Sequence, residues 1–443
     1  MSRCLVIGLD CLDPDLVEDL LDDLPVLRGL IQRGEFRRLR SVDPPITVPA
    51  WMCAFTGRDP GELGVYGFRN RVDRSYDGLR IATSASFRAP AVWDELGRMG
   101  LRSIVVGVPG TYPPKPVRGL LVSGFLAPDT DRDYTFPRAL KLRIRELVGE
   151  YIIDVRDFRT DDKSHVIAEV HRMTACRFRL ISALLSEEEW DFAAFVEMGP
   201  DRIHHALWAH HDPSHPKHDP RSPYRNAIRD YYRYLDARIG ELLEVVPPGT
   251  QVIVMSDHGI QGARGGIAVN EWLIREGYLA LVEYPREPLT MRELIERGLV
   301  DWPRTIAWGE GGYYGRIFLN VKGREPEGTV PPGDYEEVRR ELAEKLSAIA
   351  DEEGVPLGTK VLFPEETYRE VNGIPPDLIV YFGDLRWRSI GTVGRGVIHW
   401  RENDTGPDDA NHAPHGVFIA APTLAGRDLS LPEVHGLILG LYR

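Results

Sequence analysis

The sequence contains few cysteines and no long apolar segment. Four of its 443 residues are cysteines, namely Cys4, Cys11, Cys53 and Cys176. Their spacing matches neither a disulfide framework nor a zinc knuckle, and so few thiols are typical of a reducing compartment. The apolar run at residues 4–9 is too short for the core of a signal peptide. No stretch approaches the roughly 20 apolar residues of a membrane span. We therefore expect a cytoplasmic protein that does not enter a membrane.

An excess of positive charge is also absent. The chain has 54 Lys and Arg residues against 67 Asp and Glu residues, which gives a formal net charge of −13. Such a surface repels the phosphate backbone of nucleic acids, so we expect no binding to a nucleic acid duplex. A small phosphorylated substrate would need local positive charge, and bound metal ions are one source of it. The sequence leaves the oligomeric state open.

Short apolar runs that end abruptly in polar residues indicate buried strands. These runs are Cys4–Leu9, Ser103–Val108, Phe192–Val196, Val252–Met255, Leu378–Phe382 and Val417–Ala420. Continuous apolar runs of this length are typical of strands that are buried on both faces, as in parallel sheets.

Amphipathic segments between these runs predict helices. They are Asp15–Arg33, which should break near Pro25 and end at Gly34, and then Ser164–Leu185, Tyr224–Val245 and Tyr335–Ala350. Strands that alternate with helices predict an α/β protein with a doubly wound, mostly parallel sheet. In such sheets, ligands bind beyond the carboxyl ends of the strands.

One long segment differs in composition from the rest of the chain. Residues 265–376 contain proline- and glycine-rich turns, as at 331–333, and a glycine–tyrosine cluster at 309–314. We expect this segment to be a cap inserted into the α/β core. The core would then consist of residues 1–264, with a small insertion at about 68–89, and residues 377–443.

Acidic residues and histidines concentrate next to the predicted strand ends. They are Asp10 after the first run, Asp201 and His205 after the third, Asp257 and His258 after the fourth, and His412 and His415 before the last. Carboxylate and imidazole groups together are the ligands expected for zinc or manganese. An isolated Asp at a strand end is usually a helix cap. The metal interpretation is favoured because all these groups fall on the same predicted side of one sheet.

Thr47 precedes a short predicted helix. Pro49 suits the first turn of a helix that runs to about Thr56, which places Thr47 at the N-terminal end, where the helix dipole favours an anion. The alternative is that Thr47 only caps the helix. Because a hydroxyl is a poor nucleophile until a metal lowers its pKa, a catalytic role for Thr47 depends on the metal site.

Taken together, these residues resemble one known family. The matching segments are Val6–Asp10, Pro44–Trp51 followed by Thr56 and Gly57, Glu197–His205, Met255–Gly259 and His412–Val417. In this order, and spread over nearly the whole chain, they resemble the type I phosphodiesterase/nucleotide pyrophosphatase branch of the alkaline phosphatase superfamily.

The resemblance implies a hydrolase of phosphate esters with two metal ions, usually Zn²⁺, with Mn²⁺ or Fe as alternatives. One metal would be bound by Asp10, Asp257, His258 and the Thr47 oxygen, and the other by Asp201, His205 and His412. It also implies that Thr47 attacks phosphorus and forms a phosphothreonine intermediate that water then hydrolyses. His204 and His415 remain alternative ligands.

The residues that would contact the substrate are less well defined. Nucleotide-cleaving members of the family have an Asn where Phe68 stands here, and Asn70 is the nearest substitute. Without that amide, a phosphomonoester or a phosphonate becomes the more plausible substrate. Tyr313 and Tyr314 would either line a substrate pocket by stacking or simply pack within the cap. Arg202, next to Asp201, would either help to bind phosphate or, as we expect, be a solvated surface residue.

Other enzyme classes and an inactive protein are the remaining alternatives. Sulfatases need a Cys or Ser followed by Pro and Arg at set spacing, which the segment around Thr47 lacks. Metal-dependent phosphoglycerate mutases typically use Ser, so the Thr disfavours that class. An inactive relative that only binds a metal or a phosphorylated ligand would be expected to have lost at least one of the six ligands, and all six are present.

Overall fold

The computed structural model describes residues 3–443, which form two compact units. The core unit consists of the described residues up to Phe68, Ala82–Ile260 and His412–Arg443, and the second unit consists of Arg69–Ile81 and Gln261–Asn411. Across residues 3–443, no helix combines the length and the apolar character needed to cross a membrane.

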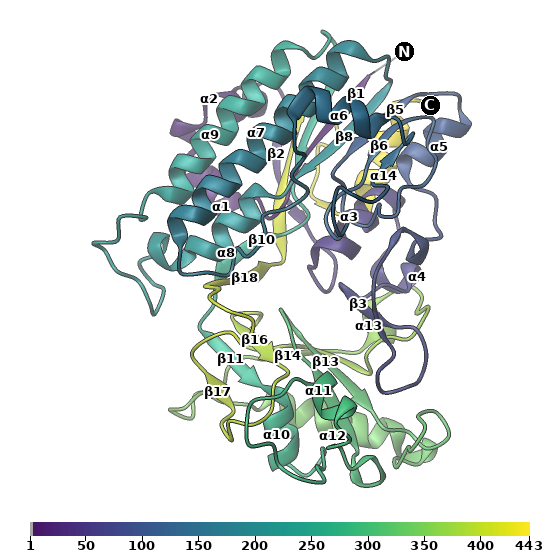
Figure 1. Ribbon diagram of the computed structural model, residues 1–443, viewed down its shortest axis with the longest axis vertical. Coiled ribbons are helices and arrows are strands. Elements are labelled where there is room, and N and C mark those ends of the chain that lie inside the picture. The colour runs from purple at the N-terminus through teal and green to yellow at the C-terminus, as the bar shows by residue number, and fades with distance from the viewer. Residues whose placement is uncertain (1–2) are drawn as a thin grey trace. The chain divides into compact units, whose positions relative to one another are not determined.

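A nine-stranded sheet runs through the core unit (Figure 1). Its order is β20-β2-β19-β9-β1-β8-β5-β6-β7. The strands are β1 (Cys4–Leu9), β2 (Glu35–Arg40), β5 (Ser103–Val106), β6 (Gly119–Val122), β7 (Thr135–Phe136), β8 (Phe192–Glu197), β9 (Gln251–Met255), β19 (His415–Ala421) and β20 (Leu429–Ser430). The five adjacent strands β9, β1, β8, β5 and β6 are parallel. The predicted mostly parallel α/β sheet is therefore confirmed.

The register of the central strands brings three strand ends to one edge. In β1, Leu9 pairs with Glu197 of β8, and Gly8 pairs with Met255 of β9. All three strands are buried along their whole length, as their continuous apolar sequences predict. Strand β19 runs antiparallel to β9, so it begins at the edge where the other three end.

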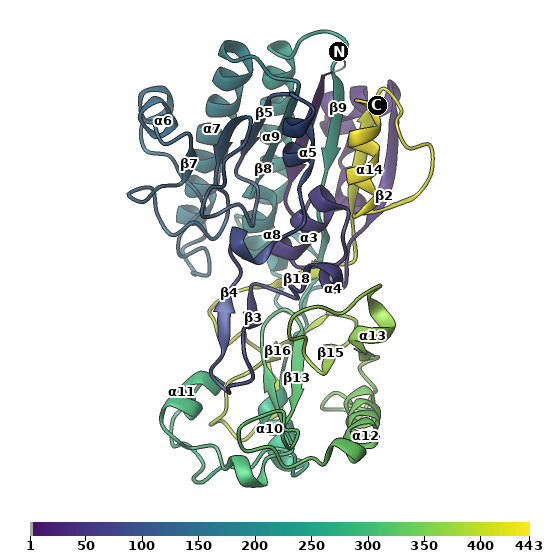
Figure 2. The ribbon, with the colours of Figure 1, turned by 90° about the vertical axis from the view of Figure 1, so that its right-hand side faces the viewer.

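Helices cover both faces of this sheet. They are α1 (Pro14–Asp19), α2 (Pro25–Gln32), α3 (Thr47–Thr56), α4 (Pro60–Leu63), α5 (Val92–Arg98), α6 (Leu140–Val148), α7 (Lys163–Glu187), α8 (Gly199–His211), α9 (Ala227–Glu244) and α14 (Glu433–Gly440). Helices α7, α8 and α9 lie on one face, and α3, α5 and α14 lie on the other (Figures 1 and 2). The predicted break near Pro25 is confirmed, because α2 begins at that residue.

The second unit contains two small sheets and a hairpin. Its strands are β3 (Arg69–Arg71), β4 (Leu79–Ile81), β11 (Gly265–Ala268), β12 (Ala307–Glu310), β13 (Gly315–Leu319), β14 (Lys360–Leu362), β15 (Leu378–Tyr381), β16 (Trp387–Ile390) and β17 (His399–Trp400). Its helices are α10 (Val269–Arg275), α11 (Met291–Glu296), α12 (Tyr335–Ser347) and α13 (Pro364–Thr367). The paired strands β10 (Gly259–Gly262) and β18 (Ala410–Ala413) carry the chain out of the core unit and back.

Strand β15 belongs to a different sheet from the one we expected. The apolar run at 378–382 suggested a strand of the core, but β15 pairs antiparallel with β13 and β14 in the second unit. The physical reason is that a run of four or five apolar residues shows that a strand is buried on both faces, but not which sheet buries it.

Candidate metal centre

The first group of potential ligands consists of Asp10, Asp257 and His258. Asp10 directly follows β1, while Asp257 and His258 lie in the turn after β9. All three side chains are fully buried, and their ligand atoms lie within 4.8 Å of one another. The His258 Nε2 atom is 3.3 Å from Asp257 Oδ2 and 3.9 Å from Asp10 Oδ1. The sheet register therefore brings together residues that are more than 240 positions apart in the chain.

The second group consists of Asp201, His205 and His412. Asp201 lies in the first turn of α8, His205 lies one turn later, and His412 lies on β18. The Asp201 Oδ1 atom is 3.3 Å from His205 Nε2 and 3.8 Å from His412 Nε2. The four-residue spacing does place Asp201 and His205 on one face of a helix, as the sequence predicted.

The two groups are next to each other. The rings of His258 and His412 stack with their centroids 3.7 Å apart and their planes 17° apart. The ring of His205 lies 5.4 Å from that of His412. Six potential ligands therefore surround two adjacent positions, which is the arrangement that a pair of metal ions requires.

Each carboxylate in the two groups is held at one oxygen by a donor. Trp51 Nε1 donates to Asp10 Oδ2 at 2.6 Å, the Cys11 backbone N–H donates to Asp257 Oδ1 at 3.2 Å, and Arg202 donates to Asp201 Oδ2. Within the described residues, the other three oxygens (Asp10 Oδ1, Asp257 Oδ2 and Asp201 Oδ1) are buried and accept no hydrogen bond. Buried polar atoms without a partner are rare, and a bound cation would satisfy these three.

Two of the histidines are oriented by backbone carbonyl groups. His258 Nδ1 lies 3.1 Å from the Gly259 carbonyl oxygen, and His412 Nδ1 lies 2.6 Å from that of Pro45. Because a carbonyl oxygen only accepts, each imidazole donates from Nδ1 and presents the lone pair of Nε2. That tautomer is the one that binds a metal through Nε2.

The electrostatics of the centre also fit divalent cations. Burial, reinforced by repulsion from neighbouring carboxylates, raises the pKa of Asp10 and Asp257 well above the usual range. Burial lowers the pKa of His258 to about 4, so this imidazole is neutral. Burial alone would raise the pKa of Asp201, but His205 and Arg202 hold it well below its usual value. A cation between the carboxylates would remove the repulsion and keep both Asp10 and Asp257 ionised.

Thr47 lies at the first of these groups. It is the first residue of α3 and is 2% exposed, and its Oγ1 atom is 3.4 Å from His258 Nε2. The N-cap position belongs to Ile46, so Thr47 is not the cap residue that its sequence also allowed. The first backbone N–H groups of a helix have no partner within it, so they can bind an anion beside Thr47. The predicted helix from Thr47 to Thr56 is confirmed.

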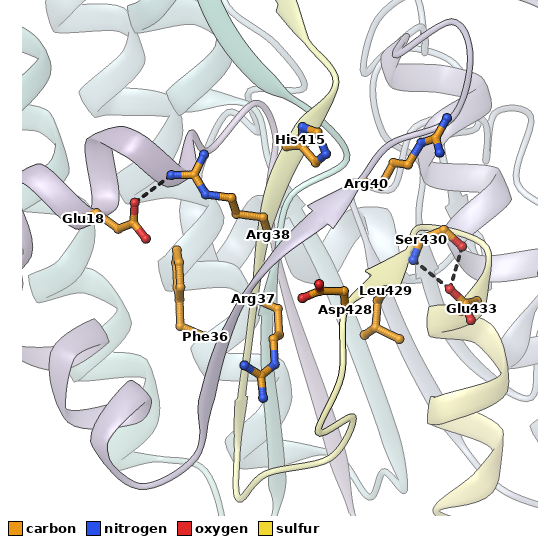
Figure 3. Close-up of a pocket in the computed structure, with 10 residues that line it drawn as sticks. All are labelled: Glu18, Phe36, Arg37, Arg38, Arg40, His415, Asp428, Leu429, Ser430 and Glu433. Carbon is orange, nitrogen blue, oxygen red and sulfur yellow. Dashed lines mark hydrogen bonds and ion pairs between the residues drawn. The ribbon is translucent and has the colours of Figure 1, made fainter.

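The two ambiguous histidines belong to neither group. His204 is fully buried, and its Nε2 atom is 3.1 Å from the Tyr232 hydroxyl. His415 is exposed at the start of β19 and lines a surface groove beside Arg38 and Arg40 (Figure 3). The groove arginines pair with carboxylates, as Arg38 does with Glu18, so the groove is balanced in charge.

The predicted substrate contacts lie in different parts of the chain. Asn70 is on β3 of the second unit. Tyr313 and Tyr314 belong to the same unit and lie between β12 and β13. The Tyr313 ring packs under the Arg388 guanidinium at 4.5 Å, and Tyr314 is 5% exposed. Their roles in substrate binding stay predictions. In the core unit, the Phe68 ring packs edge-on against Phe125 at 5.6 Å.

Two residues beside the ligands have roles that the sequence did not reveal. Arg202 is buried instead of solvated, and its guanidinium bridges Asp201 and Asp154. This pairing could not be predicted because Asp154 lies 48 residues away in an irregular segment. Trp51 belongs to the core, as expected, but its hydrogen bond to Asp10 was missed. The only signal was its position one helical turn after Thr47.

The fold and the two ligand groups define an α/β protein with a candidate paired metal centre at the carboxyl edge of its sheet. The sequence matches the family of type I phosphodiesterases/nucleotide pyrophosphatases over residues 4–408. The chain therefore belongs to this family, within the alkaline phosphatase superfamily. Comparison with curated proteins gave no match.

Several solved structures share the fold. A phosphonoacetate hydrolase from Sinorhizobium meliloti 1021, in complex with phosphonoformate, superposes with a TM-score of 0.61 at 15% identity, over 100% of this chain and 95% of that one. Human ectonucleotide pyrophosphatase/phosphodiesterase 5 gives 0.55 at 14% identity, over 99% and 94%. An inactive threonine-to-alanine variant of the murine protein, in complex with AMP, gives 0.54 at 14% identity, over 100% and 95%.

Proposed function

We propose that the protein is a metal-dependent phosphohydrolase that cleaves phosphate esters through a phosphothreonine intermediate at Thr47. The observation that carries this proposal is the position of the Thr47 hydroxyl, 3.4 Å from Nε2 of His258 in the first ligand group, whose ring stacks on that of His412 in the second. One metal would be held by Asp10, Asp257 and His258 together with the Thr47 oxygen. The other would be held by Asp201, His205 and His412. Zn²⁺ is the expected metal, with Mn²⁺ or Fe as alternatives.

Different parts of the site would have different roles in the reaction. The bound metals would lower the pKa of the Thr47 hydroxyl and offset the charge on the phosphoryl group. The N-terminal N–H groups of α3 would bind a phosphoryl oxygen. Thr47 Oγ1 would form a bond to phosphorus as the bond to the leaving oxygen breaks. Water would then cleave the phosphothreonine and restore Thr47.

The proposed substrate is a phosphodiester or a nucleotide-like ester. The family supports this class, and the murine relative whose structure holds AMP is inactive as a threonine-to-alanine variant. Phosphonate hydrolysis is the second candidate. It is favoured by the similarity to a phosphonoacetate hydrolase and by the contact of Phe68 with Phe125 where nucleotide-cleaving relatives would place an amide.

A matched pair of threonine variants tests the proposed function. Thr47→Ala removes the nucleophile, whereas Thr56→Ala removes a buried hydroxyl from the other end of α3, where it donates to the Met52 carbonyl. After reconstitution with Zn²⁺ or Mn²⁺, we expect about two metals per chain and hydrolysis of at least one ester among aryl diesters, monoesters and phosphonates. Thr47→Ala should lower kcat by at least about a thousandfold, and Thr56→Ala should leave it nearly unchanged.

The same experiment distinguishes an enzyme from an inactive ligand-binding relative. Full metal content without turnover on any ester, together with unchanged ligand binding in Thr47→Ala, would contradict the enzymatic proposal. Turnover that survives in Thr47→Ala would contradict the role of the nucleophile and leave the metal centre in place.

A further inference from the structure

The Trp51 side chain extends from helix α3 and packs against β1, the strand that Asp10 directly follows. Its side chain is fully buried and stacks on Phe55 at 6.1 Å between ring centroids. The ring also lies against Gly8 of β1, where an added Cβ would come within 2.7 Å of the indole. The glycine near the end of β1 therefore leaves the space that the indole occupies. These contacts fix the position of the indole N–H.

The indole determines which oxygen of Asp10 is available for a metal. Trp51 Nε1 donates to Asp10 Oδ2 at 2.6 Å, a short hydrogen bond within a fully buried pair. The other oxygen, Oδ1, is the one that lies 3.9 Å from His258 Nε2. Without the indole donor, the carboxylate would be free to rotate about χ2, and Oδ2 would lose its partner.

Trp51 also links this carboxylate to the nucleophile. It lies four residues after Thr47 on α3, so the two side chains are on the same face of the helix, one turn apart. Thr47 Oγ1 and Asp10 Oδ1 both face His258 Nε2. The helix that carries the hydroxyl therefore also holds one of the ligands of the adjacent group.

We propose that Trp51 is a positioning residue that orients Asp10 toward the metal of the first group and sets the affinity for that metal. In the second group a different residue orients the carboxylate, because the cationic Arg202 donates a hydrogen bond to Asp201. Loss of the indole should therefore weaken the binding of one metal and leave the binding of the other nearly unchanged. This inference rests on the proposed function, since it assumes that both groups bind metal.

A titration of metal binding tests the inference without measuring catalysis. Trp51→Phe removes the N–H donor and keeps an aromatic ring. Trp190→Phe is the matched control, because Trp190 is 3% exposed and donates from Nε1 to the Leu185 carbonyl at 3.1 Å. Zn²⁺ is titrated into each metal-depleted protein against a competing chromophoric chelator. We expect Trp51→Phe to weaken one of two sites by about 10- to 100-fold and the control to match the wild type.

The outcomes separate the inference from the proposed function. If the wild type binds two metals and Trp51→Phe binds them with unchanged affinities, or weakens both equally, the positioning role is refuted and the proposed function stands. If the wild type binds no metal, the proposed function itself fails. Should Trp51→Phe not fold, Trp51→Met decides, since the flexible thioether fills apolar space and has no N–H donor. One weakened site supports the role, and two unchanged sites contradict it.

Discussion

A buried ion pair beneath the second ligand group gives a quantitative prediction. Arg177 of α7 and Glu197 at the end of β8 are both fully buried, with Arg177 Nε 3.8 Å from Glu197 Oε2. The Glu197 carboxylate also accepts from the backbone N–H of Gly199, the first residue of α8, at 2.9 Å. The pair thus supports the turn from which Asp201 projects.

The expected size of the effect follows from the burial of both charges. Arg177→Met would leave the Glu197 carboxylate without its cationic partner in a fully buried position. Breaking one partner of a buried pair costs about 3–5 kcal/mol of unfolding free energy. The double variant Arg177→Met/Glu197→Gln removes both charges, so its cost should be less than the sum of the single costs, by up to about 3 kcal/mol.

A partly exposed arginine of similar chemistry provides the control. Arg143 pairs with Glu187 and Glu188, but its side chain is 34% exposed. Arg143→Met should therefore cost no more than about 1 kcal/mol. The assay is urea unfolding of five proteins after metal removal, so that metal binding does not add to the free energy: the wild type, Arg177→Met, Glu197→Gln, the double variant and Arg143→Met. If Arg177→Met costs as little as Arg143→Met, or if the two single costs simply add, the reasoning is refuted.

Two further predictions concern other parts of the core unit. The Glu35 side chain accepts from the three backbone N–H groups of residues 424–426, and these bonds hold its pKa below the usual value although burial alone would raise it. Because the pKa of Glu35 is lower in the folded state, these bonds stabilise the fold fully at pH values above the unfolded-state pKa of about 4.3. The stabilisation is lost as the pH falls through the folded-state pKa. Glu35→Gln should lower the unfolding free energy by about 1.5–3 kcal/mol at pH 7 and by less at pH 3. If urea unfolding gives the same free-energy difference between Glu35→Gln and the wild type at pH 7 and at pH 3, the prediction is contradicted. Asp257→Asn and His205→Gln should each reduce the metal content from about two ions to about one per chain after dialysis, and a variant that retains both ions would contradict its assigned ligand.

The two groups of potential metal ligands could be predicted from the sequence because their parts follow from local rules. Asp10, Asp201 and Asp257 each follow a continuous apolar run, and the carboxyl ends of parallel strands meet at one edge. Asp201 and His205 have helical spacing, and Pro49 marks the start of α3. The same rules predicted the central sheet and the long helices α7 and α9.

Features that depend on distant partners could not be predicted in this way. The burial of Arg202 follows from Asp154, and the orientation of His412 follows from the Pro45 carbonyl, 367 residues away. The role of Gly259, the first residue of β10, also depends on a distant segment. Its backbone does not require a left-handed turn. Instead, an added Cβ would come within 2.3 Å of the His415 carbonyl oxygen, so the glycine allows close packing of two segments.

The most direct test of the central claim is to detect the covalent intermediate on Thr47. The metal-reconstituted protein would be mixed with a substrate from the ester screen, quenched in acid within the first turnover, digested and analysed by mass spectrometry. We expect the phosphoryl group of the substrate to be attached to Thr47, and the attachment to be absent in Thr47→Ala and present in Thr56→Ala. A phosphoryl group on another residue, or rapid turnover with no modified peptide at any quench time, would contradict it.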